Sequence, residues 1–124
     1  MFKILIIDDE IKLRETLCEL FTTVGYEAFE AQDGNEGIEK VNLILPDLII
    51  CDVMMPKFDG YDFMKKLKDT NHPNIPVLFL TAKTEIDHMK KGIELGAKAY
   101  IIKPFSFKEL KRVVELYLLP KTVN

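Results

Sequence analysis

The sequence has few of the features that mark secreted, membrane-spanning or nucleic-acid-coating proteins. It holds only two cysteines, Cys18 and Cys51, in apolar stretches without metal or redox spacing. We interpret them as reduced, buried thiols of a cytoplasmic protein. No apolar run approaches the roughly 20 residues that span a bilayer, and Met1 leads directly into a strand-like segment instead of a signal peptide. The 17 basic and 20 acidic side chains leave a net charge of −3, which argues against non-specific binding to nucleic acid or anionic membranes.

The chain also lacks a linker, a low-complexity segment and any repeat beyond an alternation of strands and helices. Its 124 residues are close to the commonest size of one domain, and a hydrophobic fraction of 48% is enough for a core. We therefore predict a single domain over residues 1–124, with no second domain.

Five short segments have the character of strands. Four are continuously apolar and too short for helices, which indicates strands buried on both faces: residues 4–7, 48–51, 77–80 and 99–102. Residues 26–30 are more polar and alternate, which is typical of an edge strand.

Amphipathic helical stretches separate these strands and follow the last one. Gly25 and Gly96 are placed to end two of the helices. Asp33, with Glu36 three residues later, has the spacing of a capping box, and Ser106 begins a similar pattern. Five strand–helix units predict parallel pairing with right-handed crossovers. The predicted fold class is α/β, a doubly wound five-stranded parallel sheet with five helices on both faces.

Side chains of chemical interest follow four of the five predicted strands. Asp8 and Asp9 follow the first strand, Asp52 the third, Thr81 the fourth and Lys103 the fifth. Sites in open parallel sheets lie beyond the carboxyl ends of the strands, so we expect these side chains to meet there. Two carboxylates 4 Å apart repel by about 4 kcal/mol at an effective dielectric constant of 20. A divalent cation such as Mg²⁺, which prefers oxygen ligands, relieves that repulsion.

Asp52 is the acid best placed to react, because it follows a central strand and is flanked by the others. A carboxylate can act as a nucleophile toward phosphorus and form an aspartyl-phosphate. Such a transfer needs a metal, a cation and a hydrogen-bond donor around the phosphoryl oxygens. We predict that Asp9, with Asp8 beside it, holds the metal, and that Lys103 and Thr81 contact the phosphoryl oxygens.

With these residues in place, the chain resembles the receiver domain of two-component response regulators, of the chemotaxis-regulator type. The matching motifs are residues 7–10 (IDDE), 46–56 (PDLIICDVMMP), 59–60 (DG), 80–82 (LTA), 96–97 (GA) and 100–105 (YIIKPF). They run from the first strand to the last helix in the family's order and at its spacing. Each motif is a weak signal alone, but together they are very specific.

The resemblance implies a flavodoxin-like sheet of strand order 2-1-3-4-5. It also implies phosphorylation of Asp52 by a histidine kinase or a phosphotransfer protein. Mg²⁺, or Mn²⁺, would be bound by Asp9, Asp52 and the backbone carbonyl of Met54, with Asp8 acting through water. Lys103 would be the base that contacts the phosphoryl group.

The resemblance further implies that Thr81 and Tyr100 form a conformational switch pair. When the Thr81 hydroxyl moves to bond a phosphoryl oxygen, it would vacate space that the Tyr100 ring can fill. The surface of the fourth helix, fifth strand and fifth helix would change as a result. By the same analogy, the Lys103–Pro104 bond is expected to be cis.

The implied function is a phosphorylation-controlled signalling switch that acts on a downstream output domain or target protein. It is not an enzyme with an external substrate, although self-phosphorylation from small phosphodonors and autodephosphorylation are compatible with it. A homodimer on activation is also compatible. Lys98 and Ala99, however, stand where the winged-helix branch of the family usually carries acidic residues. This departure argues against the symmetric dimer of that branch.

Other functions remain open on the sequence alone. A Mg²⁺-dependent phosphatase of the haloacid-dehalogenase type also uses a strand-end aspartate, but it needs an acid two residues later, where this chain has Met54. An FMN-binding flavodoxin-like protein needs a hydroxyl- and glycine-rich loop after the first strand, and Asp8, Asp9 and Glu10 would repel the phosphate. A scaffold that has lost the chemistry is expected to lack a site residue, and none is missing.

Overall fold

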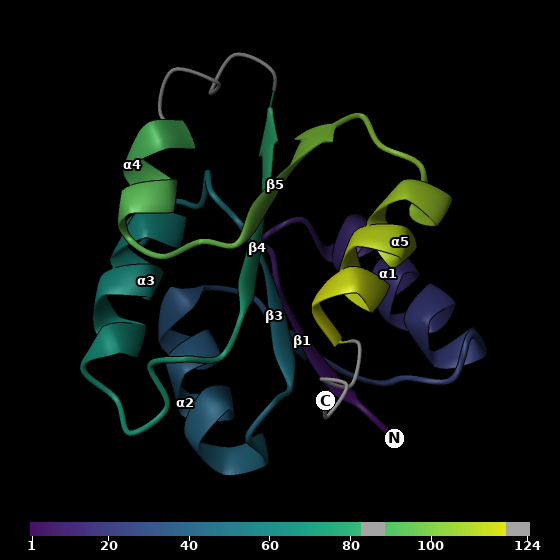
Figure 1. Ribbon diagram of the computed structural model, residues 1–124, viewed down its shortest axis with the longest axis horizontal. Helices are drawn as coiled ribbons and strands as arrows, with labels where there is room; N and C mark the ends of the chain where they lie inside the picture. The colour runs from purple at the N-terminus through teal and green to yellow at the C-terminus, as the bar shows by residue number, and fades with distance from the viewer. Residues whose placement is uncertain (83–88, 119–124) are drawn as a thin grey trace, which may run out of the picture.

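A computed structural model describes residues 1–82 and 89–118 of the chain (Figure 1). They form a five-stranded parallel sheet of order β2-β1-β3-β4-β5, which confirms the predicted topology. The strands are β1 (Lys3–Ile7), β2 (Glu27–Ala31), β3 (Leu48–Asp52), β4 (Val77–Ala82) and β5 (Ala99–Lys103). The helices are α1 (Ile11–Thr23), α2 (Gly34–Ile44), α3 (Gly60–Lys68), α4 (Met89–Glu94) and α5 (Phe107–Leu118).

The helices cover both faces of the sheet. In Figure 1, α1 and α5 lie on one face, and α2, α3 and α4 lie on the other. This two-sided covering explains why β3 is buried along its whole length and has no polar alternation. Among the described residues, no helix is both long and apolar enough to cross a bilayer.

The strand β1 shows how the sheet divides the core into two clusters. Ile4 and Ile6 pack with side chains of α1 and α5, whereas Leu5 and Ile7 pack with side chains of α2 and α3. All four are completely buried. Burial of one such side chain contributes about 1.5–3 kcal/mol, so β1 anchors both layers.

Backbone conformation confirms two of the predicted helix ends and refines one helix start. Gly25 and Gly96 have φ of 100° and 107°, values that L side chains rarely adopt. At the start of α2, Asp33 Oδ1 accepts a hydrogen bond from the Glu36 N–H at 2.9 Å. The Glu36 carboxylate, in turn, accepts from the Gln32 N–H at 2.9 Å. The second hydrogen bond of the predicted capping box therefore comes from the N–H of the residue before the N-cap and not from the N-cap itself.

The edge strand begins one residue later than predicted. The Tyr26 N–H still donates to the Phe21 carbonyl at the end of α1, at 3.0 Å. Pairing with β1 starts only at Glu27, which lies opposite Lys3. β2 nevertheless occupies the edge of the sheet, as its polar alternation predicts.

Candidate functional site

Three carboxylates meet at the carboxyl edge of the sheet, as the sequence predicts. Asp8 and Asp9 directly follow β1, and Asp52 is the last residue of the neighbouring strand β3. One oxygen from each of the three carboxylates lies within 4.8 Å of the other two. Asp8 is completely buried and Asp52 is 5% exposed, whereas Asp9 is exposed. This arrangement can hold a cation between buried and solvent-facing oxygens.

Three site residues lie inside strands instead of after them, which corrects the predicted boundaries. Asp52 still pairs with Leu80, and Thr81 pairs with Ile102. Lys103 is likewise the last residue of β5. In β3, β4 and β5 the parallel ladder continues one or two residues beyond the apolar run, because backbone pairing does not require apolar side chains.

Lys103 supplies the positive charge of the cluster. Its Nζ lies 3.4 Å from Asp52 Oδ1 and 3.9 Å from Asp8 Oδ2. The Lys103–Pro104 bond is cis, as the resemblance implied. The hydroxyl of Thr81, a residue 1% exposed on the strand between, donates to the Ala82 carbonyl at 3.3 Å. That bond is long for O–H···O, so the hydroxyl is available to a better acceptor.

The acids are crowded enough to shift their protonation. Burial, together with the charge of Asp8, raises the pKa of Asp52 to about 6, and the nearby Lys103 offsets only part of this rise. Burial also raises the pKa of Asp8, against the opposing effects of the Glu10 N–H and Lys103. A single ammonium therefore leaves the cluster under-compensated, which is the condition that a divalent cation relieves.

Asp8 carries an independent sign that the cluster fits a cation. Its Oδ1 accepts a hydrogen bond from the Glu10 N–H at 2.8 Å. Its Oδ2 is buried and has no hydrogen-bond partner among the described residues. Buried carboxylate oxygens without a donor are costly, and a hydrated Mg²⁺ beside them removes that cost.

Gly60, in the DG motif, and Arg14 hold the site in place. The Gly60 N–H donates to the Val53 carbonyl at 2.9 Å, and a Cβ on Gly60 would lie only 2.9 Å from the Asp52 carbonyl oxygen. The loop after β3 can therefore fold back onto that strand only with glycine at this position. Arg14, which donates to the Asp8 carbonyl at 2.8 Å, was missed entirely.

The two methionines after Asp52 differ in exposure. Met55 is 6% exposed and packs in the core under α2 and α3. The Met54 side chain is 56% exposed in the loop that follows β3. Because Met54 is no acid, the general acid/base that a haloacid-dehalogenase-type phosphatase needs at this position is missing.

Tyr100 lies inside the α2–α4 face of the sheet. Its ring centroid is 5.5 Å from that of Phe79. Its hydroxyl is so close to α4 that a Cβ built on Gly92 would lie 1.6 Å from it. The ring therefore occupies an inward position while the Thr81 hydroxyl is bonded to the Ala82 carbonyl.

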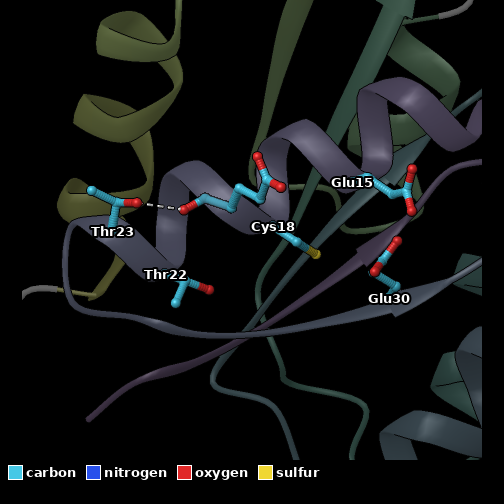
Figure 2. Close-up of a pocket in the computed structure, with 6 residues that line it drawn as sticks. Glu15, Cys18, Thr22, Thr23 and Glu30 are labelled. Atoms are coloured by element: carbon cyan, nitrogen blue, oxygen red, sulfur yellow. Dashed lines mark hydrogen bonds between the residues drawn. The ribbon is translucent and has the colours of Figure 1, made fainter.

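A separate hollow of about 580 Å³ lies between α1 and β2 (Figure 2). Its lining residues are Glu15, Cys18, Glu19, Thr22, Thr23 and Glu30. Burial, followed by the charge of Glu30, raises the pKa of Cys18 to about 12, so the thiol stays protonated and unreactive. Cys18 and Cys51 are both free, as predicted, although Cys18 is only partly buried.

Comparison with known proteins agrees with this geometry. Residues 4–115 match the model of the response regulator receiver domain. The chain belongs to this family. It is 37% identical over 116 residues to sporulation initiation phosphotransferase F of Bacillus subtilis (strain 168), covering 94% of this chain and 93% of that protein. It is 43% identical over 110 residues to the transcriptional regulatory protein PcoR of Escherichia coli, covering 89% of this chain and 48% of that protein.

Solved structures give the same answer. The Vibrio cholerae chemotaxis protein CheY4 superposes with a TM-score of 0.90 at 32% identity, covering 95% of this chain and 99% of that one. The chain spans about half the length of the transcriptional regulators that it matches. It is a receiver domain of a two-component response regulator, a phosphorylation-controlled switch. Neither FMN binding nor phosphatase activity is favoured.

The family relationship also fixes the general chemistry. Receiver domains are regulatory phosphoacceptors that generally bind Mg²⁺ at an acidic pocket, and this chain has a cluster of three aspartates, Asp8, Asp9 and Asp52. Response regulators interact with histidine kinases and with output domains.

Proposed function

We propose that Asp52 is the phosphoacceptor and that its phosphorylation changes the surface formed by α4, β5 and α5. The observation that carries this proposal is the meeting of three carboxylates within 4.8 Å, with Lys103 Nζ 3.4 Å from Asp52 Oδ1. Asp52 lies between the acids of β1 and the lysine of β5, which supports its choice over Asp8 and Asp9.

Asp9, Asp52 and the backbone carbonyl of Met54 would hold Mg²⁺ or Mn²⁺, with Asp8 acting through water. Asp8 Oδ2, which accepts no hydrogen bond from the described residues, supports this assignment. When bound, the cation neutralises charge that develops on the transferred phosphoryl group.

The chain's own residues would perform the remaining chemistry. An Asp52 oxygen forms a bond to phosphorus as the P–N bond to the donor's histidine breaks, and the departing imidazole takes up a proton. Lys103 and the Thr81 hydroxyl contact the phosphoryl oxygens and hold the group in line. Their support is the 3.4 Å ion pair of Lys103 and the weakly bonded Thr81 hydroxyl.

Thr81 and Tyr100 would form the switch pair. Engagement of Thr81 by the phosphoryl group removes its hydroxyl from the Ala82 carbonyl and stabilises the inward ring position that Tyr100 already occupies. The close packing of that ring against Phe79 and Gly92 supports a switch with discrete positions. A bias of a few kcal/mol is enough to change the population of the two states.

The donor would be a histidine kinase or a phosphotransfer protein, and the recipient of the signal an output domain or a separate target protein. Similarity to PcoR favours an output in transcription, and similarity to the phosphotransferase favours a relay. We further propose no activity on external substrates, self-phosphorylation from small phosphodonors, and a homodimer on activation. Two free cysteines agree with a cytoplasmic setting.

The test is the mass of the intact chain after incubation with acetyl phosphate and Mg²⁺, followed by peptide mapping. We expect one added phosphoryl group, on Asp52, that is absent in Asp52→Asn and without Mg²⁺. Asp69→Asn is the matched control, because Asp69 is an exposed aspartate at the far end of α3. Unchanged labelling of Asp52→Asn would refute the assignment.

A further inference from the structure

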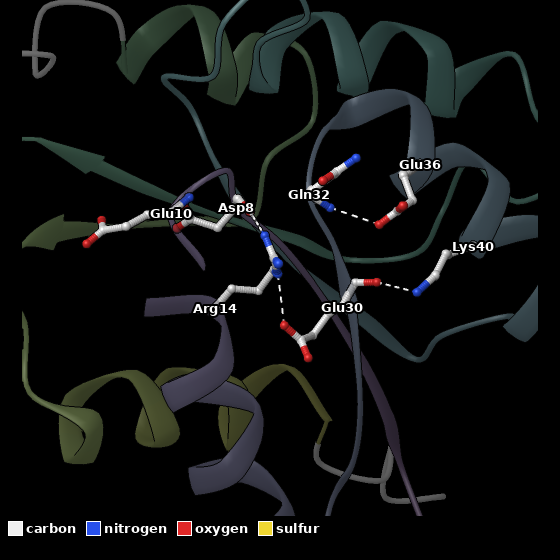
Figure 3. Close-up of polar contacts among 7 residues, drawn as sticks. All are labelled: Asp8, Glu10, Arg14, Glu30, Gln32, Glu36 and Lys40. Carbon is white, nitrogen blue, oxygen red and sulfur yellow. Dashed lines mark hydrogen bonds and ion pairs between the residues drawn. The ribbon is translucent and has the colours of Figure 1, made fainter. Parts of the chain in front are cut away.

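Arg14, near the start of α1, joins the acidic loop to the edge strand of the sheet (Figure 3). Its Nη1 donates to the Asp8 backbone carbonyl at 2.8 Å, and its Nε donates to Glu30 Oε1 at 2.8 Å. The Arg14 side chain is only 13% exposed. Its backbone N–H also donates to the Glu10 carbonyl at 3.0 Å. Arg14 thus holds the loop at both ends of Asp8–Glu10.

These bonds account for nearly all the polar atoms of Asp8. Its N–H donates to the Ala31 carbonyl of β2 at 3.1 Å, its carbonyl accepts from Arg14, and its Oδ1 accepts from the Glu10 N–H. The remaining atom, Oδ2, faces the cluster 3.9 Å from Lys103 Nζ. With three atoms bonded, the fourth has a fixed direction.

Glu30 provides the fixed end of this connection. It lies on β2, and its backbone carbonyl accepts a hydrogen bond from Lys40 Nζ of α2 (Figure 3). An arginine suits the position because its planar fork donates in two directions at once, to Glu30 and to Asp8. A lysine has one compact charge and can serve only one of these acceptors well.

We propose that Arg14 is a positioning residue for the cation site, one that acts by fixing the Asp8–Asp9 loop without touching the cation. The proposal rests on the assignment of the acidic cluster as a Mg²⁺ site in the preceding section. Partners that orient metal-binding groups contribute about 10–100-fold to metal affinity in other proteins. We therefore expect loss of Arg14 to raise the Mg²⁺ dissociation constant about tenfold or more.

The experiment is a Mg²⁺ titration of the whole chain without a phosphodonor, followed by calorimetry or by amide NMR shifts. We expect the order of affinity to be wild type, then Arg14→Lys, then Arg14→Ala. Glu30→Gln keeps an acceptor oxygen for Nε and should change affinity less than Arg14→Ala. Lys12→Ala, an exposed substitution on the same helix, is the matched control and should bind as the wild type does.

A second measurement separates positioning from general loss of stability. In metal-free protein, hydrogen exchange of the Glu10 amide reports the bond to Asp8 Oδ1. We expect faster exchange in Arg14→Ala at this amide and unchanged exchange in β3 and β4. Uniformly faster exchange throughout the sheet would instead indicate unfolding and overturn the positioning role. If Arg14 contributed only to general stability, Arg14→Lys, which retains the charge, would bind Mg²⁺ as tightly as the wild type.

The result is independent of the phosphoacceptor assignment. Failure of Asp52 labelling in acetyl phosphate would refute the proposed function but leave the difference in Mg²⁺ affinity intact. Equal Mg²⁺ dissociation constants for wild type and Arg14→Ala, or no Mg²⁺ binding by the wild type, would overturn the role of Arg14.

Discussion

The two faces of the sheet are packed by different means. On the face covered by α1 and α5, bulky side chains such as Phe21 and Leu110 fill the space, and neither helix contains a glycine. On the other face, α2, α3 and α4 all carry glycines turned toward neighbouring side chains. A Cβ would lie 2.6 Å from Ile7 at Gly37, and 1.6 Å from the Tyr100 hydroxyl at Gly92.

This difference shows where movement is restricted. The α1/α5 face is an ordinary core in which removing volume is harmful. The α2–α4 face brings rings against helix backbone, so adding volume there is harmful. The proposed switch residue Tyr100 lies on that second face, where a single methyl group on α4 decides whether its inward position exists.

The largest expected effect is on the face covered by α1 and α5, which is packed by bulky side chains. Phe21 is completely buried and meets Phe107 edge-to-face at 4.9 Å between ring centroids. Phe21→Ala should lower the free energy of unfolding by about 3–5 kcal/mol, because it removes buried area and leaves a cavity. Urea denaturation measures this value. Leu116→Ala, on the exposed side of α5, is the control and should change it by less than about 0.5 kcal/mol.

The acidic cluster lies at the edge of the sheet and belongs to neither face. Its contribution to stability can be recognised by its dependence on pH. The pKa of Asp52 is about 6 in the folded chain, above its ordinary value of 3.8. Metal-free folded protein therefore binds more protons than unfolded protein between about pH 4 and 6, so stability rises as pH falls through this window. The rise should approach about 3 kcal/mol. Urea denaturation in EDTA measures it, and Asp52→Asn should lose the part that Asp52 supplies while the part from Asp8 remains.

Gly92→Ala tests the glycine-lined face directly. Its Cβ would collide with the Tyr100 hydroxyl, so either the ring turns outward or the helix shifts. We expect a loss of about 1–3 kcal/mol, reduced by up to about 1 kcal/mol through the better helix propensity of alanine. A double-mutant cycle with Tyr100→Ala should give a coupling of about 0.5–3 kcal/mol. Additive effects would show that the two residues do not interfere.

The smallest expected effect is that of a second glycine substitution on the same face, at Gly34. A Cβ on Gly34 would lie 2.0 Å from the half-buried ring of Phe58, whereas the Tyr100 hydroxyl that a Cβ on Gly92 would meet is buried. Because Phe58 can turn toward solvent, Gly34→Ala should cost less than about 1 kcal/mol. Thermal unfolding of both alanine variants side by side measures the difference. An equal loss at Gly34 and Gly92 would mean that burial of the opposing atoms is irrelevant.

The sequence predicts the sheet and the meeting of the acids, because both follow from apolar periodicity and parallel topology. It does not reveal Arg14, whose role depends on two partners, one of them 16 residues away on strand β2. The contact of Gly92 with Tyr100 is hidden for the same reason. Periodicity reports which side of an element is buried, whereas these contacts depend on the depth to which neighbouring elements pack.

The strand order determines the distance over which the proposed signal acts. Asp52 on β3 and Tyr100 on β5 have one strand, β4, between them. Strands lie about 4.8 Å apart, so the two positions are separated by about 10 Å. Thr81 lies on that intervening strand, so the proposed signal passes through one residue and needs no relay of distant parts.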